Sequence, residues 1–201
     1  MKLVGPWFSG YTRRVGVSLR LLDIPFEHLP FNAFVDKEAV GRFNPMVKVP
    51  ALVLDDGEIL FDSGAIVDYL DERVGPEKAL IPASGAKRRE ALRIVGIASA
   101  VYGKISQIYD ESLRPEGLRS MNIRQSLLHQ SVTGFSMLEA KTERGWMVRD
   151  SLSQADIMTV ITFQSAARGQ LADQTNSQTF PRLAALVDRA VALAPFSSTL
   201  A

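Results

Sequence analysis

The chain contains no cysteine, and this absence excludes several kinds of chemistry. Disulfide bridges, thiolate metal sites and a cysteine nucleophile all need a side chain that the sequence does not have. Any thiol chemistry must therefore use a thiol that arrives with a ligand. Histidine is nearly as scarce, because His28 and His129 are the only two. Two histidines are too few for a histidine-rich metal site, and we expect no bound metal.

The sequence also lacks an excess of charge and a long apolar run. The net charge is +1, from 23 basic and 22 acidic side chains, which favours neither nucleic acid nor an acidic membrane as a partner. No apolar run approaches the ~18 residues that a membrane-spanning helix needs. The N-terminus is too short and too interrupted for a secretory signal. We therefore expect a cytoplasmic protein without nucleic-acid or membrane partners.

Strand and helix signals alternate along the first 75 residues. A short strand is expected at 2–5, and apolar residues at helical spacing predict a helix from Thr12 that Pro25 ends. The remaining expected elements are a strand at 26–31, a weak helix at 36–43, a hairpin of strands 49–54 and 58–61 around an Asp-Asp-Gly turn, and a helix at 63–74. This order predicts a small α/β domain over residues 1–75 with a mixed sheet.

Strand signals nearly vanish in the rest of the chain. Residues 76–86 are rich in proline and glycine and are expected to form a linker. Apolar residues then recur at helical spacing around 92–108, 127–138, 157–161 and 183–191, the last ended by Pro195. The sequence therefore predicts an all-helical domain over residues 87–201.

Ser153 and Asp156 stand just before the third of these helices. A serine followed three residues later by an acidic residue is typical of a helix cap, worth about 1 kcal/mol. A catalytic serine–aspartate pair is the alternative interpretation, although no histidine lies near it in the sequence.

Five segments follow one another along the chain: SGYTRRVGVSL, NPMVKVPAL, LFDSGAIVDYLDE, SQADI and FPRLAALVDRAVALAPF. In this order they resemble the cytosolic glutathione S-transferase family. The resemblance covers essentially the whole chain and is to bacterial, serine-type members with a tau- or omega-like N-terminal motif but no cysteine. It implies a thioredoxin-like N-terminal domain, an all-α C-terminal domain, glutathione as the co-substrate and, as is common in the family, a homodimer.

The resemblance also implies which residues bind glutathione. The Val49–Pro50 bond is expected to be cis, with the Val49 backbone pairing with the cysteinyl backbone of glutathione. Asp62 and Ser63 open a helix, where the γ-glutamyl ammonium and carboxylate would bind, and Lys48 could meet the glycyl carboxylate. Simpler interpretations remain for each: a trans proline that starts a strand, a plain helix cap and a solvated lysine.

Ser9 is the candidate catalytic residue, because the resemblance places its hydroxyl beside the glutathione thiol. A helix-capping serine is the alternative, and Tyr11 is the rival hydrogen-bond donor. Thr12 is expected to be the N-cap of the first helix rather than a catalyst. Arg13 and Arg14 are expected to be scaffold and surface charge near Ser9.

A small hydrophobic electrophile is the expected second substrate. Tyr102, Ser106 and Tyr109 lie on compatible faces of the long helix and, with Tyr11, are candidates for lining its pocket. The expected function is a glutathione transferase that conjugates the thiolate of glutathione to this electrophile. Two other functions stay open: a non-catalytic binding or scaffold protein on the same fold, and a specialised glutathione-dependent lyase, isomerase or dehalogenase.

Overall fold

The structure is a computed structural model that describes residues 1–143, 145–148 and 150–200, and these form two compact units. The first unit contains Met1–Ala83 together with the segment from Val191 onward, and the second contains Ser84–Ala190. Among the described residues, no helix combines the length and the apolar character needed to cross a bilayer.

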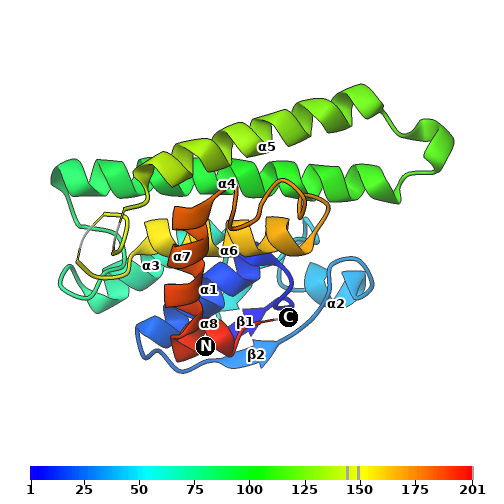
Figure 1. Cartoon of the computed structure of the whole chain (residues 1–201). Coiled ribbons are helices and arrows are strands. Elements are labelled where there is room, and N and C mark those ends of the chain that lie inside the picture. Colours follow the sequence, from blue (N-terminus) through cyan, green and yellow to red (C-terminus); the bar gives the residue numbers. More distant parts are fainter. Residues whose placement is uncertain (144, 149, 201) are drawn as a thin grey trace. The chain divides into compact units, whose positions relative to one another are not determined.

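A four-stranded mixed sheet forms the centre of the first unit (Figure 1). Its strands are β1 (Lys2–Val4), β2 (Glu27–Leu29), β3 (Ala51–Val53) and β4 (Ile59–Phe61), in the spatial order β2-β1-β3-β4. β1 runs parallel to β2 and antiparallel to β3, and β3 and β4 form the predicted antiparallel hairpin. Leu3 of β1 lies opposite His28 on one side and Leu52 on the other.

Two helices, α1 (Gly10–Leu21) and α3 (Ser63–Val74), pack against the sheet, while α2 (Lys37–Gly41) is a single short helix. The core between them consists of the fully or almost fully buried side chains of Leu3, Val15, Leu19, Leu52, Leu54, Ile66, Val67 and Leu70. α1 and α3 contribute their apolar faces at helical spacing, and β1 and β3 contribute paired leucines. Burial of these faces positions the first turns of both helices.

The C-terminal segment packs with the first unit, although the sequence places residues 87–201 in one helical domain. A short helix that the sequence does not predict, α8 (Ala194–Ser197), contacts α1, and Phe196 is fully buried. Arg13 donates to Thr199 Oγ1 at 3.2 Å and to the Phe196 carbonyl at 3.4 Å. These bonds join residues 183 or more positions apart, so no local pattern in the sequence indicates them. The sequence therefore assigns the C-terminal segment to the helical domain.

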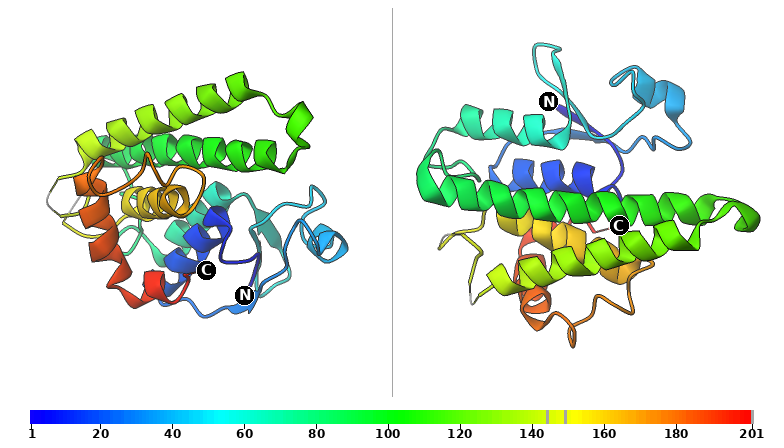
Figure 2. Two further views of the ribbon diagram at one scale, coloured as in Figure 1. Left: turned by 45° about the vertical axis from the view of Figure 1, so that its right-hand side comes forward. Right: turned by 90° about the horizontal axis from the view of Figure 1, so that it is seen from above.

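The second unit is helical, as predicted. It contains α4 (Gly85–Leu113), the short 3-10 helix η1 (Glu116–Leu118), α5 (Met121–Lys141), α6 (Gln154–Arg168) and nearly all of α7 (Pro181–Val191). α4 begins inside the expected linker. α4 and α5 lie side by side and antiparallel in both views of Figure 2. They approach closely at Gly134, where an added Cβ would lie 2.2 Å from Val101 Cγ2.

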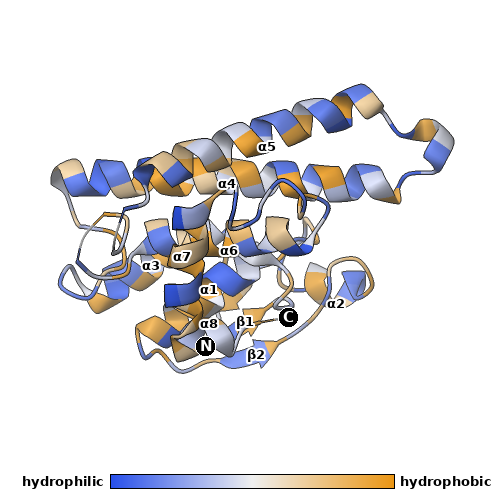
Figure 3. Ribbon diagram, in the orientation of Figure 1, coloured by the Kyte–Doolittle hydropathy of each residue, from blue (hydrophilic) through white to orange (hydrophobic). Residues whose placement is uncertain are grey.

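The interior of the second unit is built around α6. Nearly all of its residues are buried, and in Figure 3 it is mostly orange or pale, whereas α4 and α5 alternate between blue and orange. Thr162 of α6 donates to the Ala98 carbonyl of α4 at 3.2 Å. Phe163 meets Phe135 and Phe180 edge-on, with ring centroids 5.5 and 6.1 Å away. This aromatic cluster joins α5, α6 and the segment before α7.

Ser153 and Asp156 form the predicted capping box at the start of α6. The Asp156 carboxylate accepts hydrogen bonds from Ser153 N–H at 2.9 Å, Ser153 Oγ at 2.7 Å and Met147 N–H at 2.8 Å. Burial raises the pKa of Asp156, and these donated bonds act in the opposite direction. Both side chains are fully buried, so the cap interpretation is confirmed and the pair is closed to a substrate.

We expect Asp156→Ala to lower the free energy of unfolding by about 3 kcal/mol, because buried donors at Ser153 and Met147 lose their acceptor. Urea denaturation followed by circular dichroism measures the change. Asp188→Ala, at an exposed position of α7, is the matched control and should shift stability by less than about 0.5 kcal/mol. Equal stability of the two variants would contradict the role of the capping box.

Candidate functional site

Ser9 lies at the start of α1, where it is the N-cap residue. Its Oγ accepts a hydrogen bond from the Thr12 N–H at 3.4 Å, which satisfies one of the amide groups that a helix start leaves unpaired. The capping interpretation is therefore confirmed. A hydroxyl that accepts one bond still carries its own proton, so Ser9 can also donate to a ligand.

Thr12 is not the N-cap, which corrects the prediction. It is the third residue of α1 and is fully buried, because it lies against Gly5 at the end of β1. Gly5 has φ = +132°, and a Cβ on it would lie 2.3 Å from Thr12 Oγ1 and 2.9 Å from Val49 Cβ. A side chain at this position would occupy the same space as both neighbours. Gly5 thus lets the start of α1 and the segment before Pro50 come close together.

The expectation of scaffold and surface charge at Arg13 and Arg14 is wrong in its second part, because both side chains are buried and bonded to distant segments. Each is 4% exposed. Arg14 Nη1 donates to Ser63 Oγ at 3.3 Å and so links α1 to the start of α3. Burial lowers the pKa of the Arg14 guanidinium to about 10, while the negative charge of Asp62 acts against this shift. Arg14 therefore stays a cation at neutral pH, buried beneath the first turn of α3.

Asp62 and Ser63 form the start of α3. Asp62 is the N-cap, with φ = 70° and ψ = 127°, and its Oδ1 accepts from the Gly64 N–H at 2.7 Å. A positive φ is uncommon outside glycine and occurs often at functional sites. The Asp62 carboxylate is exposed, whereas Ser63 is only 3% exposed. An acidic group and a hydroxyl thus stand together at the positive end of a helix dipole.

The Val49–Pro50 bond is cis, as predicted. The segment before it is held by Asn44, which is 2% exposed and whose Nδ2 donates to the Lys48 carbonyl at 3.1 Å. The Lys48 side chain is exposed. The Val49 backbone forms no hydrogen bond with any described residue, which leaves its N–H and C=O available to an extended ligand.

Three segments far apart in the sequence therefore converge in the first unit. The start of α1 and the Val49–Pro50 segment meet at Gly5, and the start of α1 meets the start of α3 through the Arg14–Ser63 bond. These are the segments that carry Ser9, Val49 and Asp62. The arrangement offers two helix N-termini, an exposed carboxylate and an unpaired backbone segment, which suit a peptide with a charged end group.

Comparison with known proteins shows the family of this chain. The family model of the glutathione S-transferase N-terminal domain matches residues 3–78. A maleylacetoacetate isomerase of Pseudomonas aeruginosa is 31% identical over 96% of this chain and 92% of its own length. The chain belongs to the glutathione S-transferase family.

Solved structures of this family show the same fold. A glutathione S-transferase from Methylobacillus flagellatus with glutathione bound is 30% identical, with a TM-score of 0.89 over 98% of each chain. A maleylpyruvate isomerase, described as a bacterial glutathione S-transferase of the zeta class, is 25% identical, with a TM-score of 0.81 over 99% of this chain and 96% of its own. The predicted thioredoxin-like and all-α fold class is therefore confirmed.

The residues predicted to line an electrophile pocket lie in different units. Tyr11 is half-buried in the first turn of α1, and the others are on α4. Tyr102 is 9% exposed, Ser106 donates its hydroxyl to the Tyr102 carbonyl at 3.1 Å, and Tyr109 is 50% exposed. Their shared role as a pocket lining remains a prediction.

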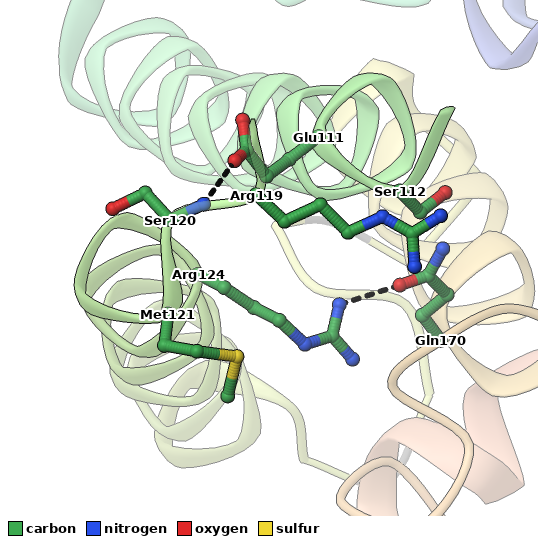
Figure 4. A pocket seen from close by; sticks show the side chains of 7 residues that line it. All are labelled: Glu111, Ser112, Arg119, Ser120, Met121, Arg124 and Gln170. Carbon is green, nitrogen blue, oxygen red and sulfur yellow. Dashed lines mark hydrogen bonds between the residues drawn. The ribbon is translucent and has the colours of Figure 1, made fainter. Parts of the chain in front are cut away.

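A cavity of about 350 Å³ lies elsewhere in the second unit, where α4 ends and α5 begins (Figure 4). Its lining residues are Glu111, Ser112, Arg119, Ser120, Met121, Arg124 and Gln170, none of which the sequence singles out. The Glu111 carboxylate accepts from the Ser120 N–H at 2.6 Å, which lowers the pKa of Glu111. Arg124 donates to Gln170 Oε1 at 2.5 Å. The first bond spans the turn between α4 and α5, and the second joins the start of α5 to the segment after α6.

Two site residues are missing from the sequence-based predictions: Arg14 as a buried partner of Ser63, and Asn44 as the support of the segment before Pro50. Helical periodicity assigns arginine to the exposed side of a helix, so it gives no signal for Arg14. Asn44 lies within the segment that carries the family resemblance, but its role depends on burial. Among the described residues, no cluster of three histidines, cysteines or carboxylates could hold a metal ion.

We expect Thr12→Val to raise the free energy of unfolding by about 1 kcal/mol. Thr12 Oγ1 is buried without a hydrogen-bond partner among the described residues, so a methyl group of similar shape removes a desolvation cost. Thr162→Val is the matched control: this threonine is also fully buried, but it donates to Ala98, and its replacement should lower stability. Chemical denaturation of both variants measures the difference, and a loss of stability in Thr12→Val would contradict the expectation.

Proposed function

We propose that this chain is an enzyme that binds glutathione in its first unit and holds the glutathione thiol as a thiolate. The observation that carries the proposal is the convergence of the Ser9, Val49 and Asp62 segments around Gly5 and Arg14. The glutathione-bound relative at 30% identity supports it.

Each part of glutathione has a matching group in these segments. The exposed Asp62 carboxylate suits the γ-glutamyl ammonium. The γ-glutamyl carboxylate suits the Ser63 hydroxyl and the free N–H groups at the start of α3. The Val49 backbone can pair with the cysteinyl backbone as an added strand would, and the exposed Lys48 can meet the glycyl carboxylate.

Ser9 is the proposed donor to the sulfur. A thiol of pKa about 8.5 is only about 3% ionised at neutral pH, and lowering its pKa by about two units requires roughly 2.7 kcal/mol of preferential stabilisation. A hydroxyl hydrogen bond to an anion contributes about 1.5–3 kcal/mol. The start of α1 adds about 0.3–1 kcal/mol. These two contributions together are large enough, so no general base is needed.

Conjugation is the first proposed reaction. The thiolate attacks an electrophilic carbon of a small hydrophobic substrate, the carbon–sulfur bond forms, and the leaving group departs with the electron pair of its bond. Tyr11, Tyr102, Ser106 and Tyr109 are the proposed lining of the electrophile site. We also propose that the chain is a homodimer and that it acts in the cytoplasm.

Isomerisation is the second candidate, and the relatives named maleylacetoacetate and maleylpyruvate isomerase favour it. In such a reaction the thiolate would add to one carbon of a cis double bond. Rotation about the resulting single bond and loss of the thiolate would then give the trans product and return glutathione unchanged. This chemistry requires the same thiolate, so Ser9 would have the same role.

We expect Ser9→Ala to raise the pKa of bound glutathione by about one to two units, because the thiolate loses one hydrogen bond. Calorimetry first measures glutathione binding, and the ultraviolet absorbance of the thiolate as a function of pH then gives the pKa. Tyr11→Phe is the control and should leave the pKa unchanged.

The outcomes separate the competing functions. If the wild-type chain binds no glutathione, the enzyme proposal fails and the binding or scaffold function remains. If Ser9→Ala binds glutathione with an unchanged thiol pKa, Ser9 has no part in the mechanism. A raised pKa in Tyr11→Phe would instead identify Tyr11 as the donor.

The two reactions differ in whether glutathione is consumed. We expect turnover of maleylacetoacetate or maleylpyruvate at a constant glutathione concentration if the chain is an isomerase, and loss of glutathione with 1-chloro-2,4-dinitrobenzene if it is a transferase. Both assays need the wild-type chain and Ser9→Ala as the matched variant. Failure of a broad panel of electrophiles and cis-alkene acids despite glutathione binding would contradict both reactions.

A further inference from the structure

The buried guanidinium of Arg14 lies directly beneath the proposed carboxylate site. Its Nη1 is 3.3 Å from Ser63 Oγ, and both side chains are almost completely buried. Arg14 belongs to α1 and Ser63 is the first residue of α3, so the bond crosses 49 positions of the sequence. The contact is therefore a feature of the tertiary structure at the site rather than a local turn.

The direction of this hydrogen bond has a chemical consequence. A guanidinium group has five N–H donors and no acceptor, so Ser63 Oγ must be the acceptor in its bond with Arg14. The Ser63 hydroxyl then has its proton left for a second partner, which must be an acceptor. Arg14 thus keeps Ser63 oriented as a donor before any ligand arrives.

The charges around Ser63 also favour a ligand group that is a negatively charged acceptor. Arg14 is a cation in a poorly solvated position, where its field is weakly screened. The exposed Asp62 carboxylate stands next to Ser63, on the outer side. A buried positive charge behind a hydroxyl and an exposed negative charge beside it complement a ligand end that carries both a carboxylate and an ammonium group.

We propose that Arg14 is a positioning residue for the γ-glutamyl carboxylate of glutathione, acting through the Ser63 hydroxyl without touching the ligand. The inference rests on the proposed glutathione site. It adds that recognition of the α-amino acid end depends on a cation from α1, and not only on the first turn of α3.

The test compares glutathione with γ-aminobutyryl-cysteinyl-glycine, which lacks only the γ-glutamyl carboxylate. Calorimetry gives the ratio of the affinities for the two peptides. It is measured for the wild-type chain and for Arg14→Met, Arg14→Gln, Arg14→Lys and Ser63→Ala. We expect the wild-type chain to prefer glutathione by about 10- to 100-fold, as a charge-assisted hydrogen bond would provide. Arg14→Met and Arg14→Gln should lose most of this preference, as should Ser63→Ala, whereas Arg14→Lys should keep part of it.

Arg13→Met is the matched control. Arg13 is the adjacent residue of the same helix and is equally buried, but it bonds to Thr199 and to the Phe196 carbonyl. The variant should be less stable yet keep the wild-type preference. A purely structural role for Arg14 would lower the affinity for both peptides by the same factor.

The possible results lead to different conclusions. If Arg14→Met or Arg14→Gln folds and keeps the wild-type preference for glutathione, the inference is overturned. If neither of these two variants folds, the charge-conserving Arg14→Lys decides. Arg14→Lys and Ser63→Ala are compared when both fold. If Arg14→Lys prefers glutathione no more than Ser63→Ala does, the result also contradicts the inference. Failure of the wild-type chain to bind either peptide instead overturns the proposed function.

Discussion

A buried guanidinium group must find hydrogen-bond acceptors, and this requirement organises the first unit. Arg13 and Arg14 are neighbours on α1, and their side chains reach different parts of the chain. Arg14 bonds to Ser63 at the start of α3, and Arg13 bonds to the C-terminal segment around Phe196. Leaving either cation unpaired inside the protein would cost several kcal/mol, so these partners are strongly preferred. α1 is consequently the element to which the site and the C-terminus are both attached.

The site also requires the start of α1 and the Val49–Pro50 segment to lie close to the backbone of Gly5. Gly5 has no side chain, and Thr12 and Val49 can therefore both lie close to its backbone. Ser9 caps α1 from the same loop. The proposed thiolate donor and the proposed peptide-pairing segment thus depend on one glycine, while the proposed amino-acid end depends on Arg14. A ligand that bridges these places must have an extended backbone and a charged end, which is the chemistry of a γ-linked tripeptide.

Much of the fold follows from local patterns in the sequence. The hairpin around Asp55-Asp56-Gly57, α3 over Ser63–Val74 and the capping box at Ser153 were predicted from turn residues, helical periodicity and cap spacing. Element ends were less accurate, because α1 begins at Gly10 rather than at Thr12 and α4 begins inside the expected linker. Helix boundaries depend on which residue caps the helix, and both Ser9 and Thr12 are acceptable caps by type.

The sequence by itself determined the fold class, the absence of a protein thiol and the residue types at the candidate site. Only the tertiary structure decided that Arg13 and Arg14 are buried, that Thr12 lies inside the helix against Gly5 and that the C-terminal segment belongs with the first unit. Periodicity and capping act over a few residues, so a sequence displays them directly. Burial of a charge depends on partners 49 and 183 or more positions away, and such partners become apparent only when the chain is folded.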